Sequence, residues 1–258
     1  MGQALIQGAR ESGVAGKDIS VSDPSVTARE KCASLFDTNT FSNNEEATEN
    51  ADIVVLSVKP QIIGKALQSV AASGRENLLY ISVAAGVTLE QLNSYSEKNI
   101  AIVRCMPNTP AIIRAGITAL IANQNVTELQ RSDAENLLTA VGKTVWLNKE
   151  SLMDAVTAIS GSGPAYFFML IELLESCAVE LGLSAELAKE LAVQTAYGAC
   201  KLARNASESP GELRENVTSP NGTTEAALRV FAAEEIDRIV KSAVTAARDR
   251  SIELAKGN

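Results

Sequence analysis

The sequence predicts an α/β protein in which a doubly wound, mostly parallel sheet lacking its first strand is followed by an all-helical domain. Short apolar strands alternate with helices over residues 1–150, which is typical of a parallel sheet covered by helices. Over residues 151–258 the strand signals stop and long helical patterns follow. Apolar residues make up 46% of the chain and aromatic residues only 4%, which favours helices packed on a sheet or on one another.

The first domain is expected to alternate helices and strands from its first residue. The expected helices cover residues 1–9, 25–35, 62–72, 89–94 and 127–141. The expected strands cover residues 19–24, 52–60, 78–86, 100–107, 117–122 and 144–147. The strand at 52–60 contains the apolar run 53–56, as expected for a strand buried on both faces, and Pro60 stops it because proline cannot donate to a sheet ladder.

Three of these strands end in small or turn-forming residues, at 57–60, 84–87 and 106–110. In open parallel sheets, ligands bind beyond the carboxyl ends of the strands. Small residues at those ends let a ligand approach the backbone, although tight strand-to-helix turns favour the same residues. The three ends together indicate a ligand crevice along one edge of the sheet.

The opening of the chain resembles the end of a Rossmann-like dinucleotide fingerprint. Gly2 would be its third glycine, which packs helix against strand. Asp23 would be the acidic residue that binds the ribose about 20 positions later. The first two glycines and the strand before them are not in this chain, and neither is the phosphate cradle that they form.

The second domain is expected to be a set of helices. They cover residues 152–159, 165–181, 185–204, 224–233 and 235–256, with a short helix after the capping box at 209–212. The first is expected to end at the turn 160–164, where Pro164 suits the first turn of the next helix. The helix at 165–181 is apolar on nearly all sides, as in a helix buried in a core or against another chain. Because little sheet is left to cover such helices, we expect a dimer in which they interlock.

A turn leads directly into a helix within residues 216–228. Pro220 fixes its own φ, and the Asn-Gly pair after it tolerates positive φ. Thr223 or Thr224 is expected to cap the helix. Free backbone N–H groups at a helix start attract an anion such as a small carboxylate, and the hydroxyls of Ser219 and the two threonines could add hydrogen bonds. The alternative is a helix cap with a turn before it and no ligand.

The composition excludes several classes of function. A formal charge of −8 opposes a nucleic-acid surface. Without any histidine, Ser-His-Asp catalysis, Cys-His catalysis and the usual histidine metal sites are excluded. The four cysteines form no Cys-x-x-Cys pair, so neither a zinc site nor a disulfide framework is expected, and a reduced, cytoplasmic setting fits better. No apolar run is expected to reach membrane length, because residues 164–174 are too few, and no signal peptide opens the chain.

The motifs together resemble the pyrroline-5-carboxylate reductase family over almost the whole chain. The most specific stretches follow the family's order and cover residues 57–60, 82–87, 104–110, 160–166 and 210–228. The resemblance implies that a hydride passes from NADPH, or less often NADH, to the imine carbon of 1-pyrroline-5-carboxylate and gives L-proline. It also implies a homodimer, and in some cases a larger homo-oligomer, formed through the helical domain.

The resemblance also implies roles for residues at matching positions. Thr224 is expected to act in catalysis and substrate binding by hydrogen-bonding the ring nitrogen. The substrate carboxylate is expected at Ser219, Gly222 and Thr223, largely on backbone N–H groups. The expected cofactor-binding residues are Gly2, Ser22, Asp23, Asn44, Val58, Lys59, Pro60, Ala84 and Ala85. No metal ion is expected, since an electrophilic iminium can be reduced by positioning the reactants and excluding water.

Some departures from the family pattern leave alternatives open. Asn221 stands where the family usually has a second glycine, although asparagine tolerates the same backbone region. Asp23 suits a free 2′-hydroxyl better than a phosphate. A phosphate could instead be cradled by Ser22, Ser25 and Arg29, so the choice between NADP and NAD stays open. Two other functions also remain: a related reductase of another imine or keto acid, and a helical dimer without catalysis.

Overall fold

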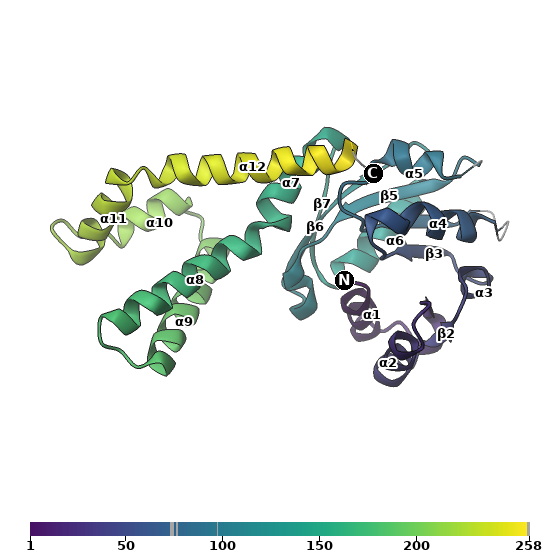
Figure 1. Ribbon diagram of the computed structural model, residues 1–258, viewed down its shortest axis with the longest axis horizontal. Helices are drawn as coiled ribbons and strands as arrows, with labels where there is room; N and C mark the ends of the chain where they lie inside the picture. Colours follow the sequence, from purple (N-terminus) through teal and green to yellow (C-terminus); the bar gives the residue numbers. More distant parts are fainter. Residues whose placement is uncertain (73–74, 76, 97, 257–258) are drawn as a thin grey trace. The chain divides into compact units, whose positions relative to one another are not determined.

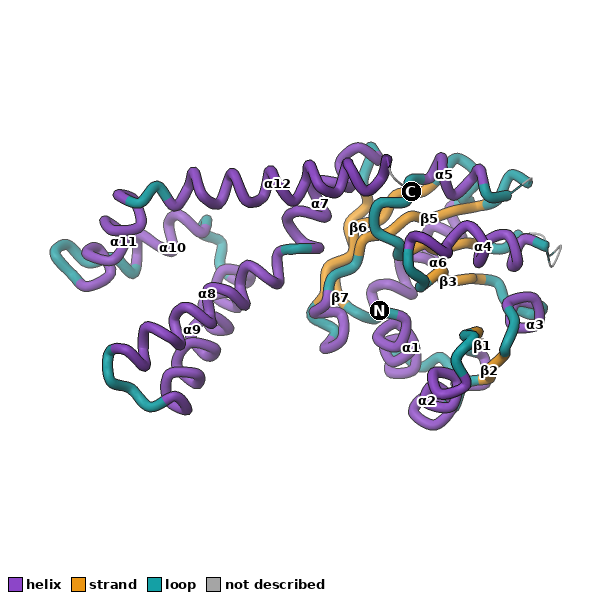
Figure 2. The backbone as a smooth tube through the Cα atoms, viewed as in Figure 1, coloured by secondary structure: helices purple, strands orange, loops and turns teal. Residues whose placement is uncertain are grey.

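The computed structural model describes residues 1–72, 75, 77–96 and 98–256, and these form two compact units (Figure 1). Unit 1 contains Met1–Ser162 together with the described residues from Ala247 onward. Unit 2 contains Gly163–Ala246. All the strands of the described chain belong to unit 1, whereas unit 2 consists of helices and their connections (Figure 2).

The sheet of unit 1 is doubly wound and mostly parallel. Its strands are β1 (Ser20–Ser22), β2 (Asn39–Phe41), β3 (Ile53–Leu56), β4 (Leu79–Ser82), β5 (Ala101–Met106), β6 (Gly116–Ala122) and β7 (Gly142–Trp146). They form two sheets with the spatial orders β1-β2 and β3-β4-β5-β6-β7. All pairs are parallel except β5 with β6. The predicted fold class is therefore confirmed.

The two sheets are separated where a first strand would lie. In the common doubly wound order 3-2-1-4-5-6, the first strand stands between the second and the fourth. Here β1 and β3 take those flanking positions, and among the described residues β1 pairs only with β2 and β3 only with β4. A sheet that lacks its first strand, as predicted, is thus split into two pieces.

The helices of unit 1 follow the predicted alternation, with one addition. They are α1 (Gly2–Glu11), α2 (Val26–Phe36), α3 (Asn44–Thr48), α4 (Pro60–Ala71), α5 (Leu89–Ser94), α6 (Glu128–Thr139) and α7 (Met153–Val156). Single turns of 3₁₀ or π type occur at η1 (Gly16–Asp18), η2 (Thr109–Ile113), η3 (Glu150–Leu152) and η4 (Thr157–Gly161). Neither β2 nor α3 is predicted from the sequence, because β2 holds a single apolar residue and the five residues of α3 are too few for a helical period.

Helices cover both faces of the larger sheet. On one face, α4 and α5 pack against the strands through Leu56, Ile63, Leu67, Leu92 and Ile102. On the other face, α1 and α6 pack through Leu5, Ile81, Val103, Ala134 and Leu138. Side chains of successive strand residues point to opposite faces, so strands with few polar residues fill both layers.

Unit 2 contains most of the long helices. They are α8 (Gly163–Glu180), α9 (Ala185–Asn205), α10 (Pro210–Asn216), α11 (Thr223–Ala233) and α12 (Ile236–Lys256), whose last residues belong to unit 1. Gly182 ends the first of them with a φ of 97°, and the Ser184 hydroxyl caps the next. Ser209 and Glu212 form the predicted capping box of α10. The all-helical second domain is confirmed.

The predicted end of a helix at residues 160–164 is wrong. There η4 is a π turn, in which Ser162 N–H donates to the Thr157 carbonyl at 2.8 Å, and α8 follows directly. Pro164 does stand in the first turn of α8, where its missing N–H leaves no helical bond unmade. A π turn accommodates one extra residue within a helix, so no loop forms at the glycine-rich segment 160–164.

The same π turn bears on the expectation that no apolar segment is long enough to cross a membrane. The helical run Glu150–Glu180 has 31 residues and is, by length and composition, apolar enough to cross a membrane. The expectation that no apolar segment is long enough therefore fails, because the π turn joins pieces that the sequence pattern separates. Length and composition alone do not distinguish a membrane span from a helix that is apolar all round because it packs against another chain.

Candidate functional site

The loop before α11 is a tight turn that leads into the helix. Asn221 has a left-handed φ of 58°, and Gly222 N–H donates to the Ser219 carbonyl at 2.9 Å. A Cβ on Gly222 would lie 3.0 Å from that oxygen, so a larger residue would crowd the turn. Gly222, with a φ of −83°, is itself the N-cap, and Thr223 is the first helical residue. The predicted cap at Thr223 or Thr224 is wrong, and only Asn221 of the Asn-Gly pair has a positive φ.

The start of α11 keeps its backbone donors open. No side chain caps the N–H groups of its first turn. Such groups bind anions, because they have no partner within the helix and lie at the positive end of its dipole. Ser219 and Thr223 are exposed and Thr224 is half-buried. Because a glycine serves as the cap, neither threonine hydroxyl is used for capping, and both are placed beside the open donors.

Glu225 holds this turn in place, and the sequence pattern alone does not single it out. Its Oε2 accepts a hydrogen bond from Asn221 N–H at 2.5 Å, and its Oε1 lies 3.0 Å from Arg229 Nη2. Glu225 is the third helical residue, the position from which the acid of a capping box reaches back to the backbone. Its spacing from Gly222 is the signal that could have revealed this role. The carboxylate therefore stabilises the left-handed turn, and Arg229 offsets its charge.

The expected cofactor residues all lie in unit 1, and several follow the parallel strands. Lys59 is the N-cap of α4 and Pro60 its first residue, just after half-buried Val58. Ala84 and Ala85 follow β4, which pairs with β3 in parallel register. Ala85 is exposed, whereas the Ala84 side chain is buried in the core, so only the backbone of Ala84 can face a ligand. The structure thus places these two predicted strand ends on one edge of the sheet, and the third, at 106–110, lies on the same edge because β5 is parallel to β4.

Gly2 begins α1 and lies against the residue that follows β3. A Cβ at Gly2 would be 3.2 Å from Ser57 Oγ, so glycine permits close packing of the helix start on the strand end. No side chain caps the first turn of α1, and such a helix end favours a phosphate group. These features fit a dinucleotide, although the glycine-rich turn of the fingerprint is not among the described residues.

The other expected cofactor residues lie on the smaller sheet and on α3. Ser22 ends β1, and the Asp23 carboxylate after it accepts a hydrogen bond from Ser25 N–H at 2.8 Å. Asn44 is the first residue of α3, and its side-chain amide donates to Ser69 Oγ on α4 at 2.7 Å. Asn44 therefore also ties two helices together, whereas Asp23 remains at the surface of its turn.

An ion pair between a buried arginine and a half-buried glutamate anchors the segment after the sheet. Arg104 on β5 is only 4% exposed, and its Nη1 lies 2.5 Å from Glu150 Oε1. The same oxygen accepts a hydrogen bond from Leu89 N–H at the start of α5. Burial raises the pKa of the neighbouring Cys105 thiol to about 12, although the guanidinium lowers it, so this thiol is not a nucleophile at neutral pH. Residues so far apart in sequence leave no local pattern from which their pairing could be predicted.

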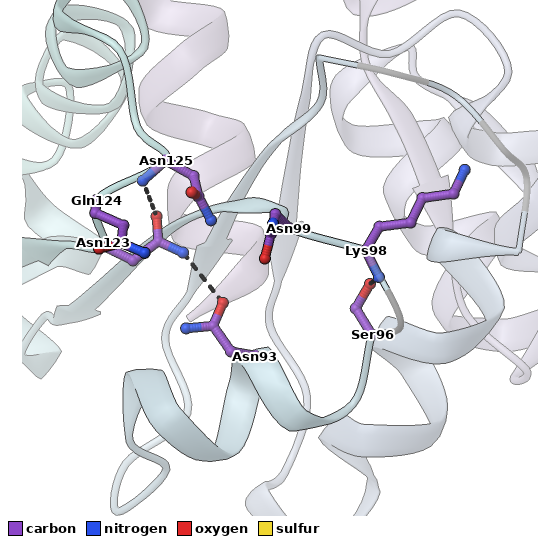
Figure 3. A pocket seen from close by; sticks show the side chains of 7 residues that line it. All are labelled: Asn93, Ser96, Lys98, Asn99, Asn123, Gln124 and Asn125. Atoms are coloured by element: carbon purple, nitrogen blue, oxygen red, sulfur yellow. Dashed lines mark hydrogen bonds between the residues drawn. The ribbon is translucent and has the colours of Figure 1, made fainter.

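A polar pocket of about 400 Å³ lies at the opposite edge of the sheet, before β5 (Figure 3). It is lined by Asn93, Ser96, Lys98, Asn99, Asn123, Gln124 and Asn125. The Asn123 side chain donates to Asn93 Oδ1 and the Ile100 carbonyl and accepts from Ile102 N–H. The central amide of this pocket therefore binds loops to one another, and none of the expected site residues lines it.

Two family models match the chain in sequence order. The model described as "NADP oxidoreductase coenzyme F420-dependent" matches residues 1–86. The model described as "Pyrroline-5-carboxylate reductase dimerisation" matches residues 150–254. A solved structure of a pyrroline-5-carboxylate reductase from Coxiella burnetii superposes with a TM-score of 0.93 at 36% identity, covering 98% of this chain and 94% of that chain. The Plasmodium falciparum pyrroline carboxylate reductase with NADP bound gives a TM-score of 0.88 at 30% identity, covering 99% and 94%.

Curated relatives extend this similarity over nearly the full length. The pyrroline-5-carboxylate reductase of Pseudomonas aeruginosa is 45% identical over 256 residues, which cover 99% of this chain and 94% of that protein. The pyrroline-5-carboxylate reductase of Haemophilus influenzae is 40% identical over 255 residues, which cover 98% and 94%. Identity at this level along the whole chain, together with the matching fold, shows that the chain belongs to the pyrroline-5-carboxylate reductase family.

Proposed function

We propose that this chain reduces 1-pyrroline-5-carboxylate to L-proline with a hydride from NADPH or NADH. The start of α11 is the observation that carries the proposal, because a left-handed turn, open backbone donors and threonine hydroxyls meet there. A small ring that bears a carboxylate and an imine nitrogen matches those groups. Reduction of another imine or keto acid, and a dimer without catalysis, are not favoured, since the full-length relatives share one name.

Each polar group of the loop has a proposed role. The carboxylate of the substrate lies on the backbone N–H groups that follow Gly222, with the hydroxyls of Ser219 and Thr223 beside it. The Thr224 hydroxyl hydrogen-bonds the ring nitrogen. The substrate reacts as the iminium, in which the ring nitrogen already carries a proton. When the iminium carbon gains a hydride, a C–H bond forms, the π electron pair of C=N moves to nitrogen, and the nitrogen keeps its proton as the N–H of the product amine. Holding that nitrogen and excluding water are what this loop contributes.

The nicotinamide cofactor supplies the hydride when it is bound. The residues proposed to hold it are Gly2, Ser22, Asp23, Asn44, Val58, Lys59, Pro60, Ala84 and Ala85. The open start of α1 suits the diphosphate, and the strand ends after β3 and β4 suit the remainder of the dinucleotide. Residues 1–150 then form the dinucleotide-binding domain, and residues 151–258 form the domain for substrate binding and dimerisation.

A second copy of the chain is the proposed partner of the helical domain. The side chains of Phe167, Phe168 and Leu173 on α8 are each more than half exposed. A homodimer that covers these apolar side chains explains their exposure better than a membrane span does, because the dimerisation family model matches the same residues. Such dimers could assemble further, in a reduced cytoplasmic setting.

Measuring turnover tests the proposed reaction, and substituting Thr224 tests its proposed mechanism. Oxidation of NADPH or NADH should depend on added 1-pyrroline-5-carboxylate. For Thr224→Ala we expect kcat/KM to fall by about 5- to 150-fold, equivalent to about 1–3 kcal/mol for one lost hydrogen bond in the transition state. Thr224→Ser keeps the hydroxyl and should retain most of the rate. Equal rates in the alanine variant and the unchanged chain would remove Thr224 from the mechanism, and no turnover with either cofactor would contradict the reaction.

A further inference from the structure

The guanidinium of Arg104 is buried within unit 1. Arg104 lies next to Ser82 on β4 and Ile121 on β6. Within the described residues, Glu150 is the only side chain with which its guanidinium forms an ion pair or a hydrogen bond. Because a buried cation left without its partner is costly, Arg104 holds the Glu150 carboxylate in place beside β5. The same cost of burial offsets most of the attraction, so the main effect of the pair is on position and not on stability.

The Glu150 carboxylate also holds the start of α5. The oxygen that meets Arg104, Oε1, accepts a hydrogen bond from Leu89 N–H at 2.8 Å, although the two residues lie 61 positions apart in sequence. Leu89 is the first residue of α5, so its N–H is one of those that a helix leaves without an internal partner. One carboxylate oxygen therefore joins β5, η3 and α5.

The turn that leads to Leu89 contains two of the expected cofactor residues, Ala84 and Ala85. It covers residues 83–88 between β4 and α5. At the β4 end, Val83 N–H donates to a backbone carbonyl of β3 at 3.3 Å. At the α5 end, the bond from Leu89 N–H fixes it. Because the turn is short, a shift of the start of α5 moves the backbone of both alanines.

We infer, resting on the proposed function, that Arg104 and Glu150 are positioning residues for NADPH. Neither is among the residues proposed to hold the cofactor, and both act through Leu89 N–H by keeping the turn 83–88 in the conformation that lies along the dinucleotide. A turn that is already formed binds a ligand more tightly than a loose one, because less conformational freedom is lost on binding. The effect falls on the cofactor and not on the substrate, because the proposed substrate loop belongs to unit 2.

Substitutions of Glu150 test the inference through cofactor binding and through the separate KM values. Glu150→Ala should weaken binding of NADP⁺ in calorimetric titration about tenfold or more and raise the KM for NADPH by a similar factor. The KM for 1-pyrroline-5-carboxylate and kcat should stay within about twofold. Glu150→Gln keeps an oxygen that accepts from Leu89 N–H, so it should restore binding to within about threefold of the unchanged chain.

Two further variants test the cation and the specificity of the effect. Arg104→Met removes the group that orients Glu150 and should give the same pattern with a smaller loss, since Leu89 N–H still binds the carboxylate. Asp52→Ala breaks the ion pair of an exposed carboxylate with Arg75, before the amino end of β3. This control lies at the opposite edge of the sheet from the turn and should leave NADP⁺ binding unchanged.

Substitutions of Leu89 test the other half of the link and leave the ion pair intact. Leu89→Pro removes the N–H that Glu150 accepts, at the first helical position, where proline is tolerated. Leu89→Ala truncates the same buried side chain but keeps the N–H. We expect the proline variant to bind NADP⁺ about fivefold or more weakly than the alanine variant, because one hydrogen bond separates them. A loss of packing alone would affect both variants equally.

Three results would overturn the inference. These are unchanged NADP⁺ binding in Glu150→Ala, no rescue by Glu150→Gln, and equal binding by the two Leu89 variants. Trp146 fluorescence shows whether each variant is folded at the temperature of the titration, and the Leu89 variants decide alone if Glu150→Ala does not fold.

The reaction itself is scored separately, as oxidation of NADPH by the unchanged chain that depends on 1-pyrroline-5-carboxylate. A chain that turns over while its variants bind NADP⁺ normally keeps its proposed function and loses only the role of Arg104 and Glu150. An unchanged chain that neither binds NADP⁺ nor turns over contradicts both proposals.

Discussion

Unit 1 buries its large apolar side chains, whereas unit 2 leaves them exposed. On β4 of unit 1, Leu79, Tyr80 and Ile81 are each at most 2% exposed, whereas Phe168 and Leu173 on α8 of unit 2 are 64% and 53% exposed. All residues of unit 2 are described, and those that are buried are Gly163, Ala188 and Ala192. A unit without large buried side chains cannot gain much from the hydrophobic effect by itself. Unit 1 therefore folds around its own core, while unit 2 needs another surface.

The two units also carry different parts of the proposed site. The expected cofactor residues belong to the unit with its own core, and the loop before α11 belongs to the unit that needs a partner. The geometry of a binding site is most precise where packing fixes the residues that surround it. The geometry of the substrate loop should therefore depend on assembly, whereas the cofactor residues should keep theirs in a single chain.

The largest effect is expected in the core of unit 1. Leu67→Ala removes a fully buried side chain of α4 and should lower the free energy of unfolding by about 2–5 kcal/mol, because the cavity adds to the lost transfer energy. Ile62→Ala, at a half-exposed position on the same helix, is the control and should cost less than about 1 kcal/mol. Urea unfolding followed by fluorescence of Trp146, the single tryptophan of the chain, reports on unit 1. Equal losses at the two positions would contradict the assignment of the core.

A charge introduced on an exposed apolar side chain should weaken the dimer in unit 2 but not in unit 1. We expect Phe168→Glu to weaken dimerisation by about 30-fold or more, since burying one aromatic side chain contributes about 2 kcal/mol or more. Leu129→Glu makes the same kind of change on α6 of unit 1, where the side chain is 72% exposed, and should leave the dimer intact. Light scattering measures the mass, and Trp146 fluorescence should show unit 1 still folded. A Phe168→Glu chain that stays dimeric would leave the exposure of unit 2 unexplained.

Local side-chain patterns predict most of the helices and strands of this fold, but not how the strands pair. The predicted helix at residues 89–94 coincides with α5, because the Thr88 capping box sets its start. The predicted break at residues 160–164 fails, since Gly163 and Pro164 mark a loop in most sequences but here follow a π turn. β2 is missed because Phe41 is its single apolar residue, and its position depends on pairing with β1. Contacts within a few residues are visible in a sequence, whereas long-range pairing is not.

The candidate site shows the same limit. The sequence predicts a ligand site at the loop before α11 from its hydroxyls and its Asn-Gly pair, and it places the cap on a threonine instead of Gly222. The error arises because threonine is a good cap by its side chain, whereas here the cap is a glycine, at which a Cβ would crowd the Ser219 carbonyl. The Arg104–Glu150 pair is missed for another reason, since its two members meet only after β5 and η3 have been placed by the fold.

The smallest expected effect concerns the capping boxes of the described helices, of which unit 1 has two, at Thr88 and Thr127, and unit 2 has one, at Ser209. In unit 2, Ser209 N–H donates to Glu212 at 2.7 Å, and this bond lowers the pKa of that carboxyl. In unit 1, Thr127 and Gln130 form the equivalent box with a neutral amide. A carboxyl whose pKa is lowered by folding stabilises the folded state at pH values above its unfolded pKa, and this contribution is lost as the pH falls through the lowered folded value. Only the box of unit 2 should therefore weaken in acid.

Hydrogen exchange of the backbone amides of α10 and α6, measured from neutral to acidic pH, compares the two caps. After correction for intrinsic rates, protection of α10 should fall in acid while that of α6 stays constant. Glu212→Gln should remove the difference, because the amide still accepts from Ser209 N–H and does not titrate. Ser209→Ala should speed exchange in α10 about fivefold at all pH values, as expected for the loss of an N-cap that contributes about 1 kcal/mol. If α10 and α6 lose protection in parallel as the pH falls, the cause lies in the assembly of the whole chain and not in the carboxylate of one cap.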